Sequence, residues 1–120
     1  MQPPMIRDEG GILRLTLDDP GAKNEGQAFA IRRSLYGAVE SRDVPRVIVD
    51  LGAIDYITST GIALLIGIKR RVESRGGKVV LCRLRDEVHE LFRIMKLVQL
   101  FEIVAGEAEA IELLLPISPE

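Results

Sequence analysis

The chain has 120 residues, a length typical of one domain that can bury a core without disulfides or metal. Hydrophobic residues make up 47% and charged residues 28%, with a net charge of −2, which excludes a strongly basic surface for nucleic acid or anionic membranes. The single cysteine excludes an internal disulfide framework and is typical of a reducing compartment. We therefore expect a single domain over residues 1–120 that binds no nucleic acid and is a monomer or weak dimer.

The N-terminal segment predicts no targeting signal. Residues 1–11 lack the apolar stretch of a signal peptide, and no apolar run reaches the ~18 residues that a bilayer crossing needs. We expect a cytoplasmic protein without direct membrane insertion.

The first part of the chain predicts a hairpin followed by a helix. Residues 4–17 contain two short apolar strands around Gly10-Gly11, which would form the turn. After a turn-rich loop, residues 25–42 have apolar side chains at roughly helical spacing. These apolar positions are Phe29, Ile31, Leu35 and Val39.

The middle of the chain predicts a strand, a helix and a second strand. Residues 46–51 are continuously apolar and β-branched, as in a parallel strand covered on both faces. Residues 61–77 form a helix whose first half is apolar all round and should be deeply buried. Residues 78–84 predict the next buried strand, in which Cys82 is expected as a small core residue rather than a reactive thiol.

The last part predicts a helix over residues 86–96, a short strand over 101–104 and a helix over 106–115. In the first of these helices Asp86 is the expected N-cap, and Met95 is among the apolar positions. Strands that alternate with helices indicate an α/β domain with a largely parallel sheet, entered by an antiparallel hairpin.

Polar residues follow the strand at 46–51 and lead directly into the next helix, in the segment DLGAIDYITSTG at 50–61. In open α/β sheets, functional residues gather at the carboxyl ends of the strands. One interpretation is a capping segment, in which the oxygen of Thr58 or Ser59 accepts from the first N–H groups of the helix. A second interpretation is a threonine that carries a phosphate, whose charge would block a protein partner.

Enzyme chemistry is poorly supported. The only histidine, His89, lies on what looks like the polar side of its helix, so a nucleophilic serine lacks a base. The segment ITSTG lacks the first glycine of a nucleophile elbow, and neither a phosphate-binding loop nor metal-ligand spacing is found. We expect no catalytic residues, no metal and no cofactor.

A phospho-aspartate receiver is one alternative. Asp50 ends a strand and would be the acceptor, while Asp18 and Asp19 would hold Mg²⁺. Receivers also use a lysine after a late strand, which is missing here, and the Pro20-Gly21 pair explains the acidic pair as a turn.

Residues 44–114 resemble the STAS domain, named for sulfate transporters and anti-sigma factor antagonists. The segment VIVDLGAIDYITSTGIALLIGIKRRVESRGGKVVLCRL matches the family order of a strand ending in VDL, a short link, a segment like F-I-D-S-S-G that opens an apolar helix, then GG and a strand. The tail matches through Leu97, Leu100, Phe101 and Ile103, and the N-terminal third matches in layout. The resemblance implies a STAS-type mixed β-sheet, with an N-terminal hairpin followed by alternating helices and parallel strands.

The resemblance also implies a function. In bacterial anti-sigma factor antagonists, an anti-sigma factor that is a serine/threonine kinase phosphorylates the residue before this glycine. The unphosphorylated antagonist binds that kinase and frees a sigma factor, and a phosphatase resets the switch. By position the acceptor is Thr60, beside Gly61, with Ser59 as a second candidate and Thr58 where the family usually has Asp.

We accordingly predict a non-enzymatic, phosphorylation-controlled switch whose partner supplies the ATP. The expected partner-binding residues lie on the rim around the phosphorylation site: Asp18, Asp19, Asn24, Asp55 and Tyr56. The alternative is a constitutive STAS scaffold subunit of a signalling or transport complex, in which TSTG is only a helix cap.

Overall fold

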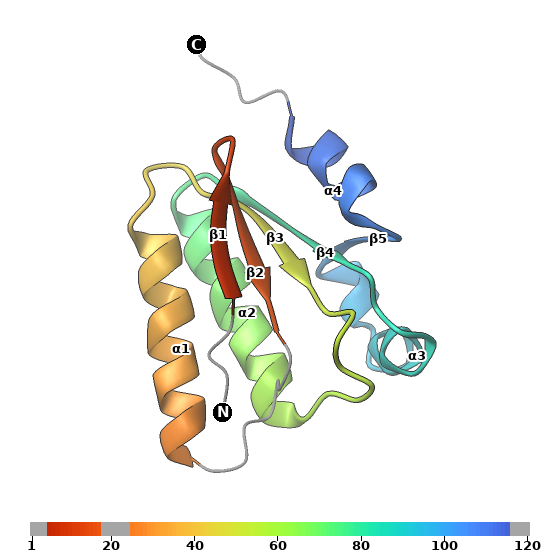
Figure 1. Cartoon of the computed structure of the whole chain (residues 1–120). Helices are drawn as coiled ribbons and strands as arrows, with labels where there is room; N and C mark the ends of the chain where they lie inside the picture. Colours follow the sequence, from red (N-terminus) through yellow and green to blue (C-terminus); the bar gives the residue numbers. More distant parts are fainter. Residues whose placement is uncertain (1–4, 18–24, 116–120) are drawn as a thin grey trace.

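The protein folds around one five-stranded sheet with the strand order β1-β2-β3-β4-β5 (Figure 1). The computed structural model describes residues 5–17 and 25–115. β1 pairs with β2 in an antiparallel hairpin, and every other neighbouring pair is parallel. In chain order the elements are β1 (Met5–Glu9), β2 (Ile12–Thr16), α1 (Glu25–Glu40), β3 (Arg46–Asp50), α2 (Ser59–Ser74), β4 (Lys78–Cys82), α3 (Asp86–Ile94), the short 3-10 helix η1 (Leu97–Gln99), β5 (Glu102–Val104) and α4 (Glu107–Leu114).

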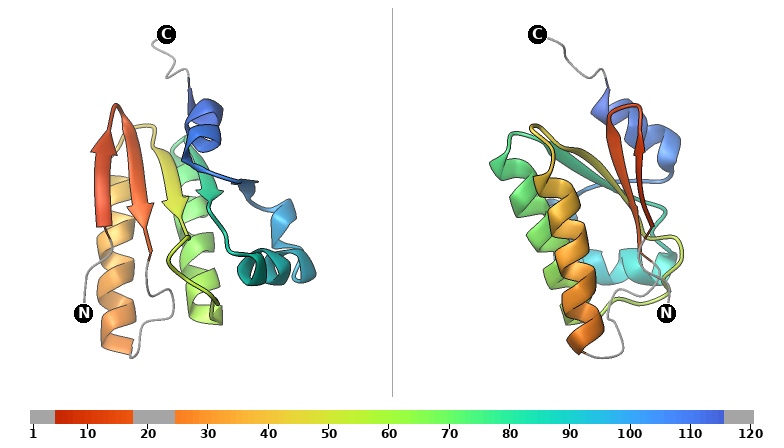
Figure 2. Two further views of the ribbon diagram at one scale, coloured as in Figure 1. Left: turned by 45° about the vertical axis from the view of Figure 1, so that its right-hand side comes forward. Right: turned by 60° about the vertical axis from the view of Figure 1, so that its left-hand side comes forward.

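Helices cover both faces of the sheet. Figure 2 shows α1 and α2 side by side on one face, α4 on the opposite face, and α3 at the end where β4 finishes. Within the two described ranges, no helix combines the length and the apolar composition needed to cross a bilayer. The predicted α/β fold, with a hairpin before a parallel sheet, is confirmed.

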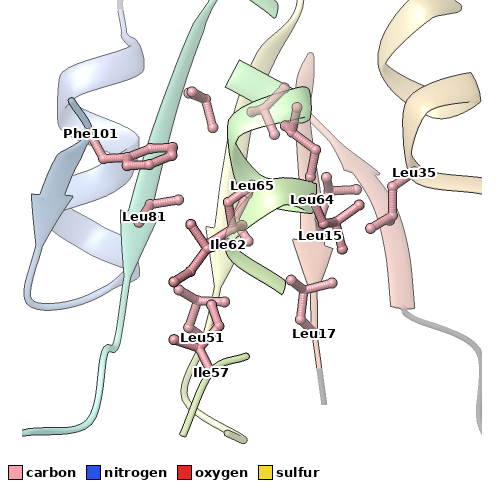
Figure 3. Close-up of a cluster of buried hydrophobic side chains, with 14 of the residues drawn as sticks. Leu15, Leu17, Leu35, Leu51, Ile57, Ile62, Leu64, Leu65, Leu81 and Phe101 are labelled. Carbon is pink, nitrogen blue, oxygen red and sulfur yellow. The ribbon is translucent and has the colours of Figure 1, made fainter. Parts of the chain in front are cut away.

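The two faces of the sheet receive alternate residues of each strand, as the pleat requires. The larger core lies under α1 and α2, and Figure 3 shows part of it, including Leu15, Leu35, Leu65 and Leu81. The smaller core lies under α4 and includes Ile48 of β3, the strand between β2 and β4. Because both faces are covered by helices, β3 and β4 are apolar almost throughout, which is why their sequences look like continuous buried runs.

Two predictions of local detail are wrong, and two of the apolar positions at helical spacing face outward. Phe29 is 51% exposed and Met95 is 48% exposed. Ala63 is also exposed, so the first half of α2 is not buried all round. Asp86 is the first residue of α3 and not its N-cap, since the cap position is Arg85, which makes no side-chain cap bond. Helical spacing identifies an apolar stripe but not the width of the stripe that a neighbouring element covers.

The backbone between the end of α2 and the start of β4 packs tightly against Pro45. A Cβ atom at Gly77 would lie 2.0 Å from the carbonyl oxygen of Pro45, which also accepts the N–H of Lys78 at 3.0 Å. Because this Cβ atom would clash with backbone atoms, the start of β4 would have to shift. We expect Gly77→Ala to lower the free energy of unfolding by about 2 kcal/mol, measured by urea denaturation.

A matched control for this change is Gly37→Ala in α1, where a Cβ atom meets nothing within 4 Å. It should leave stability unchanged or raise it by up to about 1 kcal/mol, because alanine is the better helix former. Equal destabilisation by the two substitutions would contradict the role of the Pro45 contact.

Candidate functional site

The segment between β3 and α2 is held in place by its own apolar side chains. Ile54 and Ile57 are buried, at 3% and 6% exposure, and reach the larger core. The N–H of Gly52 donates to Asp50 Oδ1 at 2.9 Å, and Arg85 Nε donates to the Gly52 carbonyl at 3.0 Å. The segment is therefore a fixed surface that joins the end of β3 to the start of both α2 and α3.

Thr58 caps α2. Its backbone is extended, and its Oγ1 accepts from the N–H of Gly61 at 3.1 Å. Its carbonyl accepts from the N–H of Ile62 at 2.9 Å, which closes the first helical turn. Of the two predicted capping residues, Thr58 is the cap, and Ser59 is the first residue of the helix.

The two candidate phosphorylation residues lie in the open first turn of α2. Ser59 and Thr60 are both exposed, whereas Gly61 is buried. The hydroxyl of Thr60 is therefore open to an enzyme, while the residue after it faces the core. The role of Thr60 as the phosphorylated residue stays a prediction.

The predicted partner-binding residues are only partly placed. Asp55 and Tyr56 are exposed in the link before α2, and Tyr56 is 68% exposed, which is high for a large aromatic side chain. Both lie on the same link as the capping residue. Asp18, Asp19 and Asn24 lie outside the described residues.

An ion-pair network lies beneath this surface, on the α4 side of the sheet. Asp50 is 3% exposed and is the only buried charged residue among residues 6–17 and 29–115, whose burial the structure describes. Its Oδ2 lies 2.8 Å from Arg14 Nη2 and 3.5 Å from Arg83 Nη1, and Arg14 Nη1 in turn lies 2.9 Å from Glu107. The hydrogen bond to Asp50 raises the pKa of Arg14 above its usual value. The network joins β2, β3 and α4.

The receiver interpretation is wrong. A phospho-acceptor aspartate has to be open to a phosphoryl donor and Mg²⁺, but the Asp50 carboxylate is buried and paired with Arg14. Asp50 is a structural residue that holds the end of β3. The proposed Mg²⁺ pair, Asp18 and Asp19, lies outside the described residues.

The prediction that Cys82 is a core residue is confirmed. Its side chain is fully buried in the smaller core under α4. Burial first, and then the negative charge of Asp50, raises the pKa of the thiol to about 11. The thiol is therefore protonated at neutral pH and a poor nucleophile. His89 is exposed on α3, as its place on the polar side of the helix predicted.

Sequence reasoning missed two exposed apolar surfaces. One follows the end of α3, where Ile94 is 64%, Met95 48% and Leu100 51% exposed. The other is Phe29 on α1, whose ring lies beneath two guanidinium groups. Both contain residues that match helical or family patterns, so the sequence offers no signal that they face outward.

We expect the Thr58 cap to stabilise the fold by a measurable amount. Thr58→Ala removes the acceptor for the Gly61 N–H and should lower the free energy of unfolding by about 1 kcal/mol. Thr58→Asp should restore it, because Asp is an equally good N-cap. Thermal unfolding of the three proteins checks this, and an Asp variant as unstable as the Ala variant would contradict the capping role.

The family match and the most similar proteins agree on one protein family. The family model of the STAS domain matches residues 5–110. BtrV of Bordetella bronchiseptica, a protein named for a proposed role as an anti-sigma factor antagonist, is 32% identical over 90 residues, which cover 75% of this chain and 76% of BtrV.

Solved structures show the same fold at low identity. An anti-sigma-factor antagonist (STAS) domain protein from Planctomyces limnophilus superposes with a TM-score of 0.83 at 15% identity, covering 96% of this chain and 100% of the other. The anti-sigma factor antagonist SpoIIAA in its unphosphorylated form has a TM-score of 0.72 at 21% identity, covering 91% and 93%. The phosphorylated form of Bacillus SpoIIAA has a TM-score of 0.67 at 20% identity, covering 91% and 96%. With the hairpin, the parallel sheet and the capped TSTG turn all in place, the family match over residues 5–110 shows that the chain belongs to the STAS domain family.

Proposed function

We propose that the chain is an anti-sigma factor antagonist, a non-enzymatic switch that binds an anti-sigma factor kinase and thereby releases a sigma factor. Phosphorylation of Thr60 would turn off this binding, and a phosphatase would restore it. The observation that carries the proposal is the exposed Thr60 in the first turn of α2, on the surface formed by the link after β3.

The geometry is suited to a switch of this kind. Thr58 already caps α2, so the fold does not depend on the hydroxyl of Thr60. A phosphate there adds about −1.5 to −2 charges at pH 7, and negative charge is tolerated near a helix start. A partner docked over Tyr56 and Thr60 would meet that charge directly. Phosphorylation can therefore change binding while the fold stays intact.

The comparisons support the same proposal. BtrV is named for an antagonist role, and SpoIIAA has been solved in both a phosphorylated and an unphosphorylated form. Both SpoIIAA structures share the fold of this chain, which agrees with a phosphate that acts on binding. A cytoplasmic location, which the proposal assumes, stays a prediction.

A constitutive scaffold is the second candidate. One observation favours it: the hydrogen bond from Gly61 to Thr58 explains the hydroxyl-rich turn as a cap without any phosphate. The exposed apolar side chains Ile94, Met95 and Leu100 would then be part of a permanent interface.

Phosphopeptide mapping separates the two candidates. The chain is incubated with ATP and, one at a time, with the anti-sigma kinases encoded in its own genome. We expect phosphate on the peptide that contains Thr60, and its loss in Thr60→Ala. Ser59→Ala is the matched control, since Ser59 is the exposed neighbour on the same turn, and it should still be labelled.

If the chain forms a stable complex with one of these kinases but neither Ser59 nor Thr60 is labelled, the switch hypothesis is rejected in favour of the constitutive scaffold. Labelling that disappears in Ser59→Ala and persists in Thr60→Ala would move the acceptor to Ser59.

A further inference from the structure

Helices α1 and α2 pack in a register that two contacts define. The hydroxyl of Tyr36 occupies the space beside Gly67, 1.9 Å from where a Cβ atom would stand. One turn further along, Arg71 Nε lies 3.1 Å from Glu40, and its guanidinium carbon is 3.7 Å from the centre of the Tyr36 ring. Tyr36 and Gly67 are separated by 67 − 36 = 31 residues, and Glu40 and Arg71 also by 31. The two helices are therefore parallel with a constant offset.

Extending the same offset by two helical turns brings Phe29 level with Thr60. Phe29 is seven residues before Tyr36, and Thr60 is seven residues before Gly67, which is about two helical turns in each case. Figures 1 and 2 show the N-terminal ends of α1 and α2 at the same end of the molecule. Phe29, Thr60 and Ala63 are all exposed, so this end of the contact between the two helices is open to solvent.

Two positive charges stand at this open end. The guanidinium carbon of Arg32 lies 5.4 Å from the centre of the Phe29 ring, and that of Arg33 lies 5.8 Å from it. Within the described ranges, neither arginine forms an ion pair. Counting the same offset, Arg32 is level with Ala63, an exposed residue with a short side chain. The offset therefore brings the two arginines to the same end of the α1–α2 contact as Thr60.

We propose that Arg32 and Arg33 bind the phosphate of phosphorylated Thr60 across the two helices. This rests on the proposed function, in which Thr60 carries that phosphate. Packed helices are about 8–10 Å apart, a gap that a long arginine side chain and a phosphothreonine bridge from opposite sides. A charge-assisted pair with phosphate is stronger than a cation–π contact at an exposed ring, so the guanidinium leaves Phe29 for the phosphate.

This exchange has a consequence for regulation. In the unphosphorylated protein, the surface beside Thr60 presents two positive charges stacked on an aromatic ring. After phosphorylation, the charges are neutralised and the ring is uncovered. A partner whose acidic groups bind Arg32 and Arg33 would lose these two contacts, so the phosphate would weaken binding by removing attraction.

The test is the second pKa of the phosphate, followed by phosphorus NMR during a pH titration. Phosphothreonine is placed at position 60 of the full chain by genetic encoding, so no kinase is needed. The ordinary second pKa is about 6. If guanidinium groups hold the dianion, the pKa should be lower in the native sequence than in the double variant Arg32→Gln/Arg33→Gln, by about 0.5 for exposed pairs.

The matched control is Arg70→Gln/Lys78→Gln, which likewise removes two positive charges, here from exposed side chains away from Thr60. Arg70 lies ten residues after Thr60 on α2, about 15 Å along the helix axis. This control should keep the phosphate pKa of the native sequence. The ring signals of Phe29 should also shift between the unphosphorylated and phosphorylated proteins, and stay in place in Arg32→Gln/Arg33→Gln.

One phosphate pKa shared by all three proteins would overturn the inference, and so would an equal rise in the double variant and the control. These outcomes are distinct from failure of the proposed function. If no kinase labels Thr60, the switch fails while the pKa still reports the pairing. If a kinase labels Thr60 but the phosphate has the same pKa in the native sequence and in Arg32→Gln/Arg33→Gln, only the arginine–phosphate pairing is refuted.

Discussion

Thr60→Glu is expected to bind the anti-sigma kinase about 30- to 100-fold more weakly than the native chain. A permanent negative charge would stand in the proposed interface, on the turn that follows the exposed Tyr56, where a mismatched charge costs several kcal/mol. About 2–3 kcal/mol corresponds to this range of dissociation constants. Thr60→Ala should bind as tightly as the native chain and resist inactivation by ATP. Isothermal titration with the purified kinase measures both.

The control for this prediction is Ser74→Glu, which adds the same charge at the exposed far end of α2. Fourteen residues of helix separate it from Thr60, about 21 Å, so it should bind normally. Circular dichroism should show that all three variants are folded. Equal affinities for Thr60→Glu and Thr60→Ala would refute the switch.

Asp50→Ala is expected to lower the free energy of unfolding by about 3 kcal/mol. The substitution leaves the guanidinium of Arg14, which is 18% exposed, without its nearest partner, and the N–H of Gly52 without an acceptor. Losing one member of a buried ion pair is far more costly than losing an exposed one, because the remaining charge stays desolvated. Urea unfolding gives the value, read as a change in midpoint at constant slope.

Two further variants show whether burial is the cause. Asp50→Asn keeps an oxygen for Gly52 and should be intermediate. Glu107→Gln alters the more exposed end of the same network, at 35% exposure, and should cost less than about 1 kcal/mol. If Glu107→Gln proved as destabilising as Asp50→Ala, the burial of Asp50 would not explain the effect.

The candidate site was found from the sequence because its signals are local. A hydroxyl residue three positions before a buried glycine, at the junction of two apolar runs, predicts a helix cap, and Thr58 and Gly61 form that bond. The exposure of Thr60 follows from the same local geometry, since the first turn of α2 has only one face on the core. The pairing of Asp50 was not found, because its partner Arg14 is 36 residues away and on another strand.

The sequence alone determined the order of the elements, the glycine turn of the hairpin and the two buried strands, since strand and helix periodicity, turn chemistry and capping act within a few residues. Which apolar side chains are buried depends instead on the folded structure. Phe29 and Met95 have the right spacing, yet about half of each side chain is exposed, while Arg14 and Asp50 are charged and still lie on the α4 side of the sheet. The folded structure also sets the offset between α1 and α2, because the hydroxyl of Tyr36 packs beside Gly67. Periodicity belongs to each element by itself, whereas burial and register depend on segments that meet only after the chain has folded.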